Sequence, residues 1–468
     1  MRRASESQIM TKIFPNKHSS NKIMTLHPTK LIVLSFFLVI LIGTLLLLLP
    51  AASRDGTGAS PIEALFTATS AVCVTGLVVV DTYKHWTTFG QVVIILLIQI
   101  GGLGLITFVT FFSALLGRKM RIRNMVLAQE SVNYFSLAGI KQLIKKVVLV
   151  TLCIEAAGAL LLSAVFVPQY GLKGFYLGVF HAISAFCNAG FDLMSISGAG
   201  QFISLTQYNN NPVVIYTIAS LIVIGGLGFV VWKDLYDYRK TRSLMLHTKL
   251  VITITPLLIV SGAILFYIFE SGNPATMGNL DLVGKINASI FQSVTPRTAG
   301  YNTVNLNGMN DVSKLLTIIL MFIGAAPGST GGGVKVTTVG IILFTILSQL
   351  KGSDEIIVFK RRVSFTSVSK ALTIIGFSFV LVLIVSTIIL VIEDNPMINI
   401  MYEVTSAFGT VGLTTGLTPG LHNVSKLLLI LMMFLGRVGP VSFALALTMK
   451  SHKTDSDIIY PEGKVMVG

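Results

Sequence analysis

The stretch ALFTATSAVCVTGL at residues 64–77 decides the expected architecture, because three similar stretches follow it along the chain. They are GVFHAISAFCNAGF (178–191), ASIFQSVTPRTAGY (288–301) and YEVTSAFGTVGL (402–413). Aligned on one glycine, the four place it at Gly76, Gly190, Gly300 and Gly412, at intervals of 114, 110 and 112 residues. A second glycine cluster follows each: GGLG (101–104), GGLG (225–228), GAAPGSTGGG (324–333) and GRVGP (436–440). Glycine is common in membrane helices, but two recurring marks at this spacing predict four structural repeats.

Long apolar runs surround these stretches. Of the 468 residues, 53% are hydrophobic and 12% are charged, whereas soluble domains carry about 25% charged residues. The run at 31–50 holds no charge, and it has roughly the 20 residues that a membrane-spanning helix needs. Similar runs lie near 91–116, 147–167, 213–232, 250–269, 315–349, 371–392 and 426–449. The sequence therefore predicts an all-α polytopic membrane protein with eight transmembrane spans.

The placement of the basic residues predicts the orientation of these spans. The formal net charge is +15, and lysine and arginine concentrate at 1–30, 117–146, 233–249, 351–370 and 450–468. These segments lie before the first span and after every second one, as in the cytoplasmic loops of membrane proteins. Both termini are therefore expected in the cytoplasm, with residues 1–29 as a disordered tail. This placement argues against nucleic-acid binding.

Each predicted repeat consists of a long span, a short apolar segment, a glycine-ended turn and a second long span. A segment of about 10–14 apolar residues is too short to cross a bilayer and is typical of a re-entrant pore helix. Each repeat then crosses the membrane an even number of times, so the four are parallel and surround one axis. The expected boundaries are a tail (1–29), repeat 1 (30–116), a cytoplasmic loop and repeat 2 (117–240), repeat 3 with a broken inner helix (241–350), a cytoplasmic loop and repeat 4 (351–450), and a cytoplasmic C-terminal segment (451–468).

The four glycine-ended turns are expected to form a selectivity filter. Irregular backbone at membrane depth is tolerated only where it is buried or lines a cavity, so the turns should converge on the axis. Their side chains share few ligand groups, which leaves backbone carbonyls, and rings of carbonyls select K+. Glycine aims such carbonyls inward because it adopts positive φ without steric cost. The predicted filter is Val74, Thr75, Gly76, Asn188, Ala189, Gly190, Thr298, Ala299, Gly300, Thr410, Val411 and Gly412.

Charged residues near the turns refine this hypothesis. Acidic residues in the predicted outer connections would form a vestibule that concentrates cations, or they would simply be solvated. They are Asp55, Asp81, Asp192, Glu270, Asp311, Glu393 and Asp394. Arg297, three residues before Gly300, is the exception. Because a cation beside a cation pathway is costly, we expect Arg297 to face behind the filter.

The segment GAAPGSTGGGVKVT (324–337) resembles a phosphate-binding loop but fails its pattern, because Val334 separates Gly333 from Lys335. It interrupts an apolar run, so we expect a flexible plug below the third turn. Lys335 and Arg437 lie in membrane segments, where a charge costs roughly 2.5–3.5 kcal/mol. A place at the inner pore or a partner carboxylate would explain them, and so would a role at a dimer interface or in capping carbonyls. The predicted gate is Ala325, Ala326, Pro327, Gly328, Ser329, Thr330, Gly331, Gly332, Gly333, Lys335 and Arg437.

From about residue 30 onward the chain resembles the membrane subunits of bacterial Ktr K+ uptake systems, in the Trk/Ktr/HKT superfamily. The motifs that carry the resemblance are ALFTATSAVCVTGLVVVDT, FHAISAFCNAGF, FQSVTPRTAGYN, MFIGAAPGSTGGGVKVTT, SAFGTVGLTTG, MFLGRVGP and YPEGKVMVG. The resemblance implies a homodimer in the bacterial cell membrane, in contact with lipid. It also implies a cytoplasmic ring of nucleotide-binding regulatory subunits of the RCK/KTN type, and K+ uptake stimulated by Na+. The turns depart from the TVGYG of tetrameric K+ channels and retain little beyond the final glycine.

Two other function classes compete with a pore as interpretations of the sequence. A Na+-coupled secondary transporter with alternating access is the main alternative, and the even number of crossings per repeat argues against it. A polytopic enzyme is disfavoured, because the seven histidines are scattered and no nucleophile–base grouping stands out. We therefore expect no organic cofactor, K+ at the filter, and Na+ as an activator.

Overall fold

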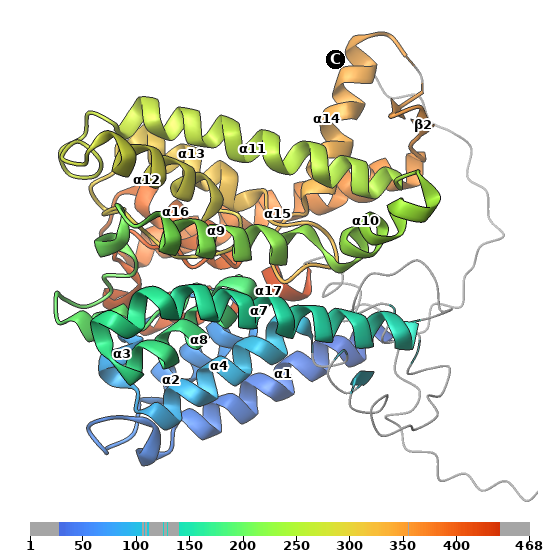
Figure 1. Cartoon of the computed structure of the whole chain (residues 1–468). Helices are drawn as coiled ribbons and strands as arrows, with labels where there is room; N and C mark the ends of the chain where they lie inside the picture. Colours follow the sequence, from blue (N-terminus) through green and yellow to red (C-terminus); the bar gives the residue numbers. More distant parts are fainter. Residues whose placement is uncertain are drawn as a thin grey trace, which may run out of the picture.

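The computed structural model describes residues 28–104, 140–353 and 355–439, together with positions 107, 110, 111, 125 and 129. Most of the predicted N-terminal tail, most of the 117–146 loop and the C-terminal segment therefore lie outside the described residues. The chain folds into helices that run side by side (Figure 1). The exception among the described elements is an antiparallel hairpin of β1 (Ile357–Val358) and β2 (Arg361–Arg362), a small departure from the all-α prediction.

Each of four successive groups of helices contains an outer, a short and an inner helix. The outer helices are α1 (Pro28–Leu47), α7 (Ile140–Tyr170), α11 (Leu246–Glu270) and α15 (Phe365–Ile392). The short helices are α2 (Pro61–Val72), α8 (Leu172–Phe186), α12 (Leu282–Val294) and α16 (Met397–Gly409). The inner helices are α4 (Thr88–Leu103), α9 (Pro212–Leu227), α13 (Asp311–Phe322) and α17 (Asn423–Val438). The remaining elements are η2 (Pro50–Ala52), α3 (Thr82–His85), η3 (Met194–Ser197), η4 (Thr206–Tyr208), α10 (Phe229–Thr241), α14 (Val336–Leu350) and η5 (Thr418–Gly420).

The outer helices fit the predicted spans, whereas the inner helices of the second and third units are interrupted. Within the described residues, α1, α7, α11 and α15 are long and apolar enough to cross a membrane, and they coincide with the first, third, fifth and seventh predicted runs. The fourth run was predicted to be continuous over 213–232, but α9 and α10 are bent by 88°. The bend falls at Gly228, whose φ is +92°, because the next backbone N–H donates to the carbonyl of Gly328 at 2.9 Å. The sixth run breaks between α13 and α14, as predicted.

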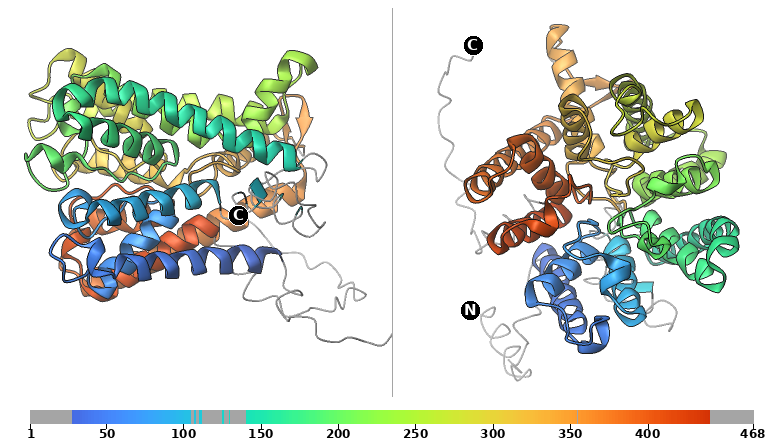
Figure 2. Two further views of the ribbon diagram at one scale, coloured as in Figure 1. Left: turned by 60° about the horizontal axis from the view of Figure 1, so that its bottom comes forward. Right: turned by 90° about the vertical axis from the view of Figure 1, so that its left-hand side faces the viewer.

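The four groups form a closed ring, as the view along the helices shows (Figure 2, right). Within each group the outer helix packs on the short helix. Between groups, each inner helix packs on the short helix of the next group: α4 on α8, α9 on α12, α13 on α16, and α17 on α2. The last pair joins the end of the chain to its beginning, so the ring has no edge. The short helices consequently lie between inner helices, with their ends inside the protein.

The first short helix begins at a local signal in the sequence. In α2, the backbone N–H of Glu63 donates to Ser60 Oγ at 3.3 Å, and the backbone N–H of Ser60 donates to Glu63 Oε2 at 2.9 Å. This capping box, with Pro61 at the first helical position, fixes the start of the helix. The 12 residues of α2 span about 18 Å, roughly half of the bilayer. The helix therefore ends at membrane depth, where the turn follows.

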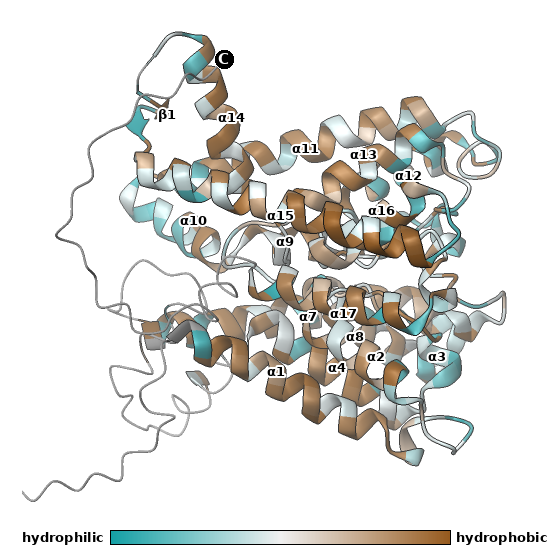
Figure 3. Cartoon of the chain, turned by 180° about the vertical axis from the view of Figure 1, so that it is seen from behind, coloured by the Kyte–Doolittle hydropathy of each residue, from teal (hydrophilic) through white to brown (hydrophobic). Residues whose placement is uncertain are grey.

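The second glycine cluster brings the inner helices of the first, second and fourth units close to a turn. A methyl group on Gly101, Gly225 or Gly436 would clash with the carbonyl group of Val72, Phe186 or Phe408, respectively. These carbonyls lie at or next to the C-terminal ends of α2, α8 and α16, so the glycines permit a backbone-to-backbone approach. Outside this packed centre, the ribbons of α1 and α15 are largely hydrophobic (Figure 3), and their apolar side chains Phe37, Leu45 and Val391 are exposed. That surface suits a lipid environment.

Candidate functional site: four turns and the loop below them

The four turns after the short helices share one backbone conformation. In each turn the aligned glycine has positive φ, and so does the residue two positions before it. The φ values are +58° and +87° for Val74 and Gly76, +59° and +69° for Asn188 and Gly190, +72° and +83° for Thr298 and Gly300, and +51° and +93° for Thr410 and Gly412. A non-glycine residue with positive φ is uncommon. Its recurrence at the same register in four units marks these turns as the candidate functional site.

The four glycines lie against one another in chain order. A methyl group on Gly190 would lie 2.5 Å from the carbonyl oxygen of Ala299, and one on Gly300 would lie 2.5 Å from the carbonyl oxygen of Val411. A methyl group on Gly412 would clash with the carbonyl of Thr75, and one on Gly76 with that of Ala189. The structure thus brings the twelve predicted filter residues together as one closed ring of backbone. In this ring, backbone carbonyls are the polar groups that every turn supplies.

Side chains at the ends of the short helices hold the turns. The hydroxyls of Ser70 and Ser406 each accept a hydrogen bond from the aligned glycine N–H at 3.0 Å. The hydroxyl of Ser184 donates to the carbonyl of Phe191 at 2.8 Å. In the third unit valine replaces this serine, and the next residue, Thr295, donates to the carbonyl of Tyr301 at 2.6 Å. The recurring serine six residues before the glycine was visible in the sequence, but its partner was not.

The predicted gate segment forms a loop between α13 and α14 that is bound to the second unit. The backbone N–H of Ala326 donates to the carbonyl of Gly226 at 3.0 Å, and that of Thr330 donates to Gly225 at 3.3 Å. The Thr330 hydroxyl also donates to the carbonyl of Phe186 at 3.2 Å. At the bend at Gly228, where α9 ends, the backbone makes a further hydrogen bond to the loop. The loop is therefore ordered by the backbone of a neighbouring inner helix.

The same loop lies against the turns of the third and fourth units. A methyl group on Gly331 would clash with the hydroxyl of Thr298, and one on Gly332 with the hydroxyl of Thr410. Thr298 and Thr410 are themselves filter residues of the prediction. The glycines thus allow the loop to approach two of the four turns more closely than other residues would. This contact places the loop directly against the ring.

Two cations hold the loop through backbone carbonyls. Lys335 Nζ donates to the carbonyls of Gly331 at 2.7 Å and Gly332 at 3.2 Å. Arg437 donates through Nη2 to the carbonyls of Gly101 at 2.5 Å and Gly102 at 3.1 Å, and through Nη1 to the carbonyl of Thr330. Arg437 therefore links the loop to the first unit across the centre of the protein. The sequence left a pore position, a partner carboxylate, a dimer interface or carbonyl capping open for these residues, and the structure shows the capping of carbonyls.

Arg297 faces away from the ring, as expected. Its side chain is 6% exposed, and Nη2 donates to the hydroxyl of Thr255 in the outer helix α11 at 3.4 Å. Its Nη1 has no hydrogen-bond partner among the described residues. The guanidinium borders a small cavity lined by Ile222, Val223, Gly226, Thr255, Val294 and Ala325. The positive charge is thus held behind the third turn, between the second and third units.

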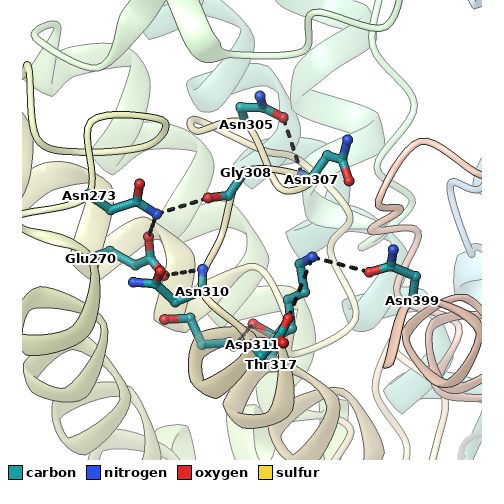
Figure 4. A network of polar contacts seen from close by, with 11 residues as sticks. Glu270, Asn273, Asn305, Asn307, Gly308, Asn310, Asp311, Thr317 and Asn399 are labelled. Carbon is teal, nitrogen blue, oxygen red and sulfur yellow. Dashed lines mark hydrogen bonds and ion pairs between the residues drawn. The ribbon is translucent and has the colours of Figure 1, made fainter. Parts of the chain in front are cut away.

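The outer acidic residues divide into exposed and structural ones. Asp55, Asp311 and Asp394 are exposed, so they remain available to attract cations. Glu270 is fully buried and accepts hydrogen bonds from Asn310 N–H at 2.9 Å, Asn273 Nδ2 at 2.7 Å and Thr276 Oγ1 at 2.6 Å. This network joins the end of α11 to the start of α13 (Figure 4). The expectation of a vestibule role for Glu270 is therefore wrong, because both of its carboxylate oxygens accept hydrogen bonds inside the protein.

Asp81 and Glu393 are structural in the same way. Asp81 caps α3 and accepts from Ser195 Oγ at 2.5 Å and Phe202 N–H at 2.9 Å, so it ties the first unit to the second. Glu393 accepts from the backbone N–H of His422 at 2.8 Å, which joins α15 to the start of α17. Sequence position alone could not separate these buried acids from the exposed ones.

Comparison with known proteins assigns this arrangement to a family. Residues 8–456 match the family described as TrkH: Cation transport protein. The chain belongs to this family. Because TrkH family members transport cations, the protein is a transporter and not an enzyme. The ring of turns and the loop below it are consequently the candidate transport site.

Relatives within the TrkH family match almost the whole chain. The chain is 41% identical to "Ktr system potassium uptake protein B" of Bacillus subtilis (strain 168), over 94% of this chain and 97% of the relative. It is 39% identical to "Potassium/sodium uptake protein NtpJ" of Enterococcus hirae, over 95% of this chain and 98% of the relative. The solved structure of the potassium transporter TrkH from Vibrio parahaemolyticus superimposes with a TM-score of 0.71 at 18% identity, covering 93% of this chain and 87% of that one. This last likeness supports the fold alone.

Proposed function

We propose that the protein takes up K+ across the bacterial cell membrane through a central pore, whose filter is the ring of four glycine-ended turns. The observation that carries this proposal is the closed chain-order contact of Gly76, Gly190, Gly300 and Gly412. Four turns that meet about one axis present backbone carbonyls from four sides, and carbonyl rings replace the hydration shell of K+. The names of the most similar relatives, which refer to potassium uptake and potassium/sodium uptake, favour K+ as the substrate.

Residues 325–333, with Lys335 and Arg437, act as the gate in this proposal. The loop contacts the second, third and fourth units, and Arg437 connects it to the first. Two positive charges held beside the pathway oppose cation passage. Opening then requires that the loop exchange its hydrogen bonds with α9 and Arg437 for other partners. The same contacts would hold the resting protein closed.

The proposal includes a regulatory partner and a second copy of the chain. Relatives named as parts of a "Ktr system" favour a partner subunit, for which we propose a cytoplasmic nucleotide-binding ring of the RCK/KTN type. We further propose a homodimer of eight-span subunits with both termini in the cytoplasm, and stimulation of K+ uptake by Na+. The alternative is a Na+-coupled transporter with alternating access. K+-driven flux in liposomes without Na+ distinguishes the two, because strict coupling would abolish it.

Replacement of the ring glycines by serine tests the filter. Gly412→Ser should weaken the preference for K+ over Na+, because the added Cβ strains a residue at φ +93° and displaces the carbonyl of Thr75. Gly198→Ser is the matched control: Gly198 has a φ of +78°, but a Cβ there meets no atom within 4 Å among the described residues. Rb+ uptake in the presence of increasing Na+ measures the preference. Wild-type preference in the Gly→Ser variants of all four ring positions would contradict the filter assignment.

A further inference from the structure

A buried carboxylate connects the fourth short helix to the chain beyond its turn. Glu403 lies in α16, is 2% exposed, and stands nine residues before the ring glycine Gly412. Its Oε1 accepts from Thr414 Oγ1 at 2.6 Å, from the backbone N–H of Thr415 at 2.9 Å and from Thr415 Oγ1 at 3.3 Å. Its Oε2 accepts from Thr418 Oγ1 at 2.5 Å. The carboxylate therefore fixes the segment that leaves the turn, and its hydrogen bonds satisfy both oxygens.

An imidazole does the same in the second unit. His181 lies in α8, is fully buried, and also stands nine residues before its ring glycine, Gly190. Its Nδ1 is 2.8 Å from the carbonyl of Leu177, and its Nε2 accepts from the backbone N–H of Leu193 at 3.3 Å. Because a carbonyl only accepts and an amide N–H only donates, the proton is fixed on Nδ1. The ring is therefore a neutral acceptor.

The two contacts have the same register. In both units, the side chain nine residues before the glycine accepts from the backbone N–H three residues after it. The other two units have Thr67 and Phe291 at this position. Among the described residues the Thr67 hydroxyl has no hydrogen-bond partner, and phenylalanine has no acceptor to offer. The contact thus occurs in the second and fourth units, which face each other across the ring.

We propose that Glu403 and His181 are positioning residues for cation selection. Each acts as a clamp, because it holds the segment of chain that leaves one of two opposite filter turns. This inference rests on the proposed filter. A carbonyl ring discriminates between cations of different size only if its oxygens hold their spacing, and supporting hydrogen bonds supply that stiffness. Ser406 holds the N–H of Gly412, and Ser184 holds the carbonyl of the residue after Gly190. Glu403 and His181 hold the chain three residues after each glycine, a contact that the described residues show in these two opposite turns.

Variants at these positions test the clamp in the full-length protein reconstituted in liposomes. Glu403→Gln keeps the shape but loses the charge, and Thr418→Val removes one donor while the carboxylate keeps Thr414 and Thr415. For His181, leucine removes the acceptor, whereas glutamine restores one at a similar reach. We expect Glu403→Gln and His181→Leu to lower the preference for Rb+ over Na+, measured as Rb+ uptake in the presence of increasing Na+, by roughly tenfold. This change is equivalent to about 1.4 kcal/mol. His181→Gln should recover most of it, and Thr418→Val should show a smaller loss.

The readout separates positioning from mere stability. Thr67→Val, at the equivalent position of the first unit, should leave the preference unchanged. A purely structural role would lower the amount of folded protein or the maximal rate at wild-type preference, and that result would overturn the inference. If Glu403→Gln is not recovered folded, the ion preference of Thr418→Val, His181→Leu and His181→Gln decides whether the inference stands. Gly412→Ser is measured alongside: a shift there without a shift at Glu403 and His181 refutes the clamp alone, whereas no shift in any ring glycine refutes the filter.

Discussion

Replacement of Arg437 by glutamine is the most direct test of the proposed gate. The guanidinium reaches two carbonyls at the end of α4, Gly101 at 2.5 Å and Gly102 at 3.1 Å, and the carbonyl of Thr330 in the loop. It therefore connects the loop to α4, an inner helix to which the backbone of the loop makes no hydrogen bond within the described part of the chain. Glutamine is shorter and carries one NH2 group, so it can keep the contact with α4 or the contact with the loop, but not both.

The magnitude follows from the bond that is lost. A hydrogen bond to a charged group contributes about 1.5–3 kcal/mol to the state that makes it. The contact with Thr330 exists only while the loop lies beneath the ring, so its loss destabilises the closed state relative to the open one by about that amount. This corresponds to a roughly 10- to 150-fold shift of the equilibrium. The flux through the protein without its partner should rise by a factor of this order, until the open fraction saturates.

The assay is Rb+ uptake driven by a K+ gradient into liposomes that contain the protein alone, normalised to folded protein. Lys426→Gln is the matched control, because Lys426 is a cation on the same helix that also donates to a carbonyl, that of Pro419 at 3.0 Å, on the outer side. We expect Arg437→Gln to raise the flux and Lys426→Gln to leave it unchanged. A folded Arg437→Gln protein whose flux equals or falls below that of the wild type would refute the gate.

Three further predictions concern the loop, the outer contacts and the partner. Deletion of 326–333 should raise K+ flux more than Arg437→Gln and make it less dependent on the partner; unchanged flux would make the loop a structural break. Burial raises the pKa of Glu393, but hydrogen bonds from Ser425 and His422, together with the charge of His422, outweigh it and hold the pKa below its ordinary 4.5. Glu393→Gln should therefore lower the thermal unfolding temperature at pH 7, and the difference from wild type should disappear as the pH falls through this lowered pKa. Removal of 460–468 together with neutralisation of Arg361 and Arg362 should weaken binding of the cytoplasmic partner in a pull-down; unchanged binding would mean that these charges serve topology alone.

Much of the candidate site could be found from periodicity. The alignment on four glycines identified the turns because all four units use the same turn conformation. Positive φ restricts the residue at the aligned position in each turn. The break between α13 and α14 was also predictable, since proline and clustered glycine cannot continue a helix. These features are local, so one stretch of sequence carries the information that specifies them.

Contacts between units could not be found in this way. Glu403 and His181 perform the same task with different chemistry, so no repeated letter marks the position. The bend at Gly228 depends on the loop that meets α9 a hundred residues later. The burial of Glu270 depends on Asn310, which closes the network from the start of α13. In each case the partner is set by packing and not by spacing.

The sequence by itself determined the membrane environment and the four similar units with a glycine-ended turn in each, while the parallel orientation of the units and the filter role of the twelve turn residues stay predictions. These follow from hydrophobic length, basic-residue placement and glycine spacing, which act within one helix or one turn. Only the tertiary structure decided the order of contact around the ring, the attachment of the loop to three units, and the link through Arg437 to the first. Closure of the ring is a property of side chains and carbonyls far apart in the chain, and their distances become fixed only when all four units pack together.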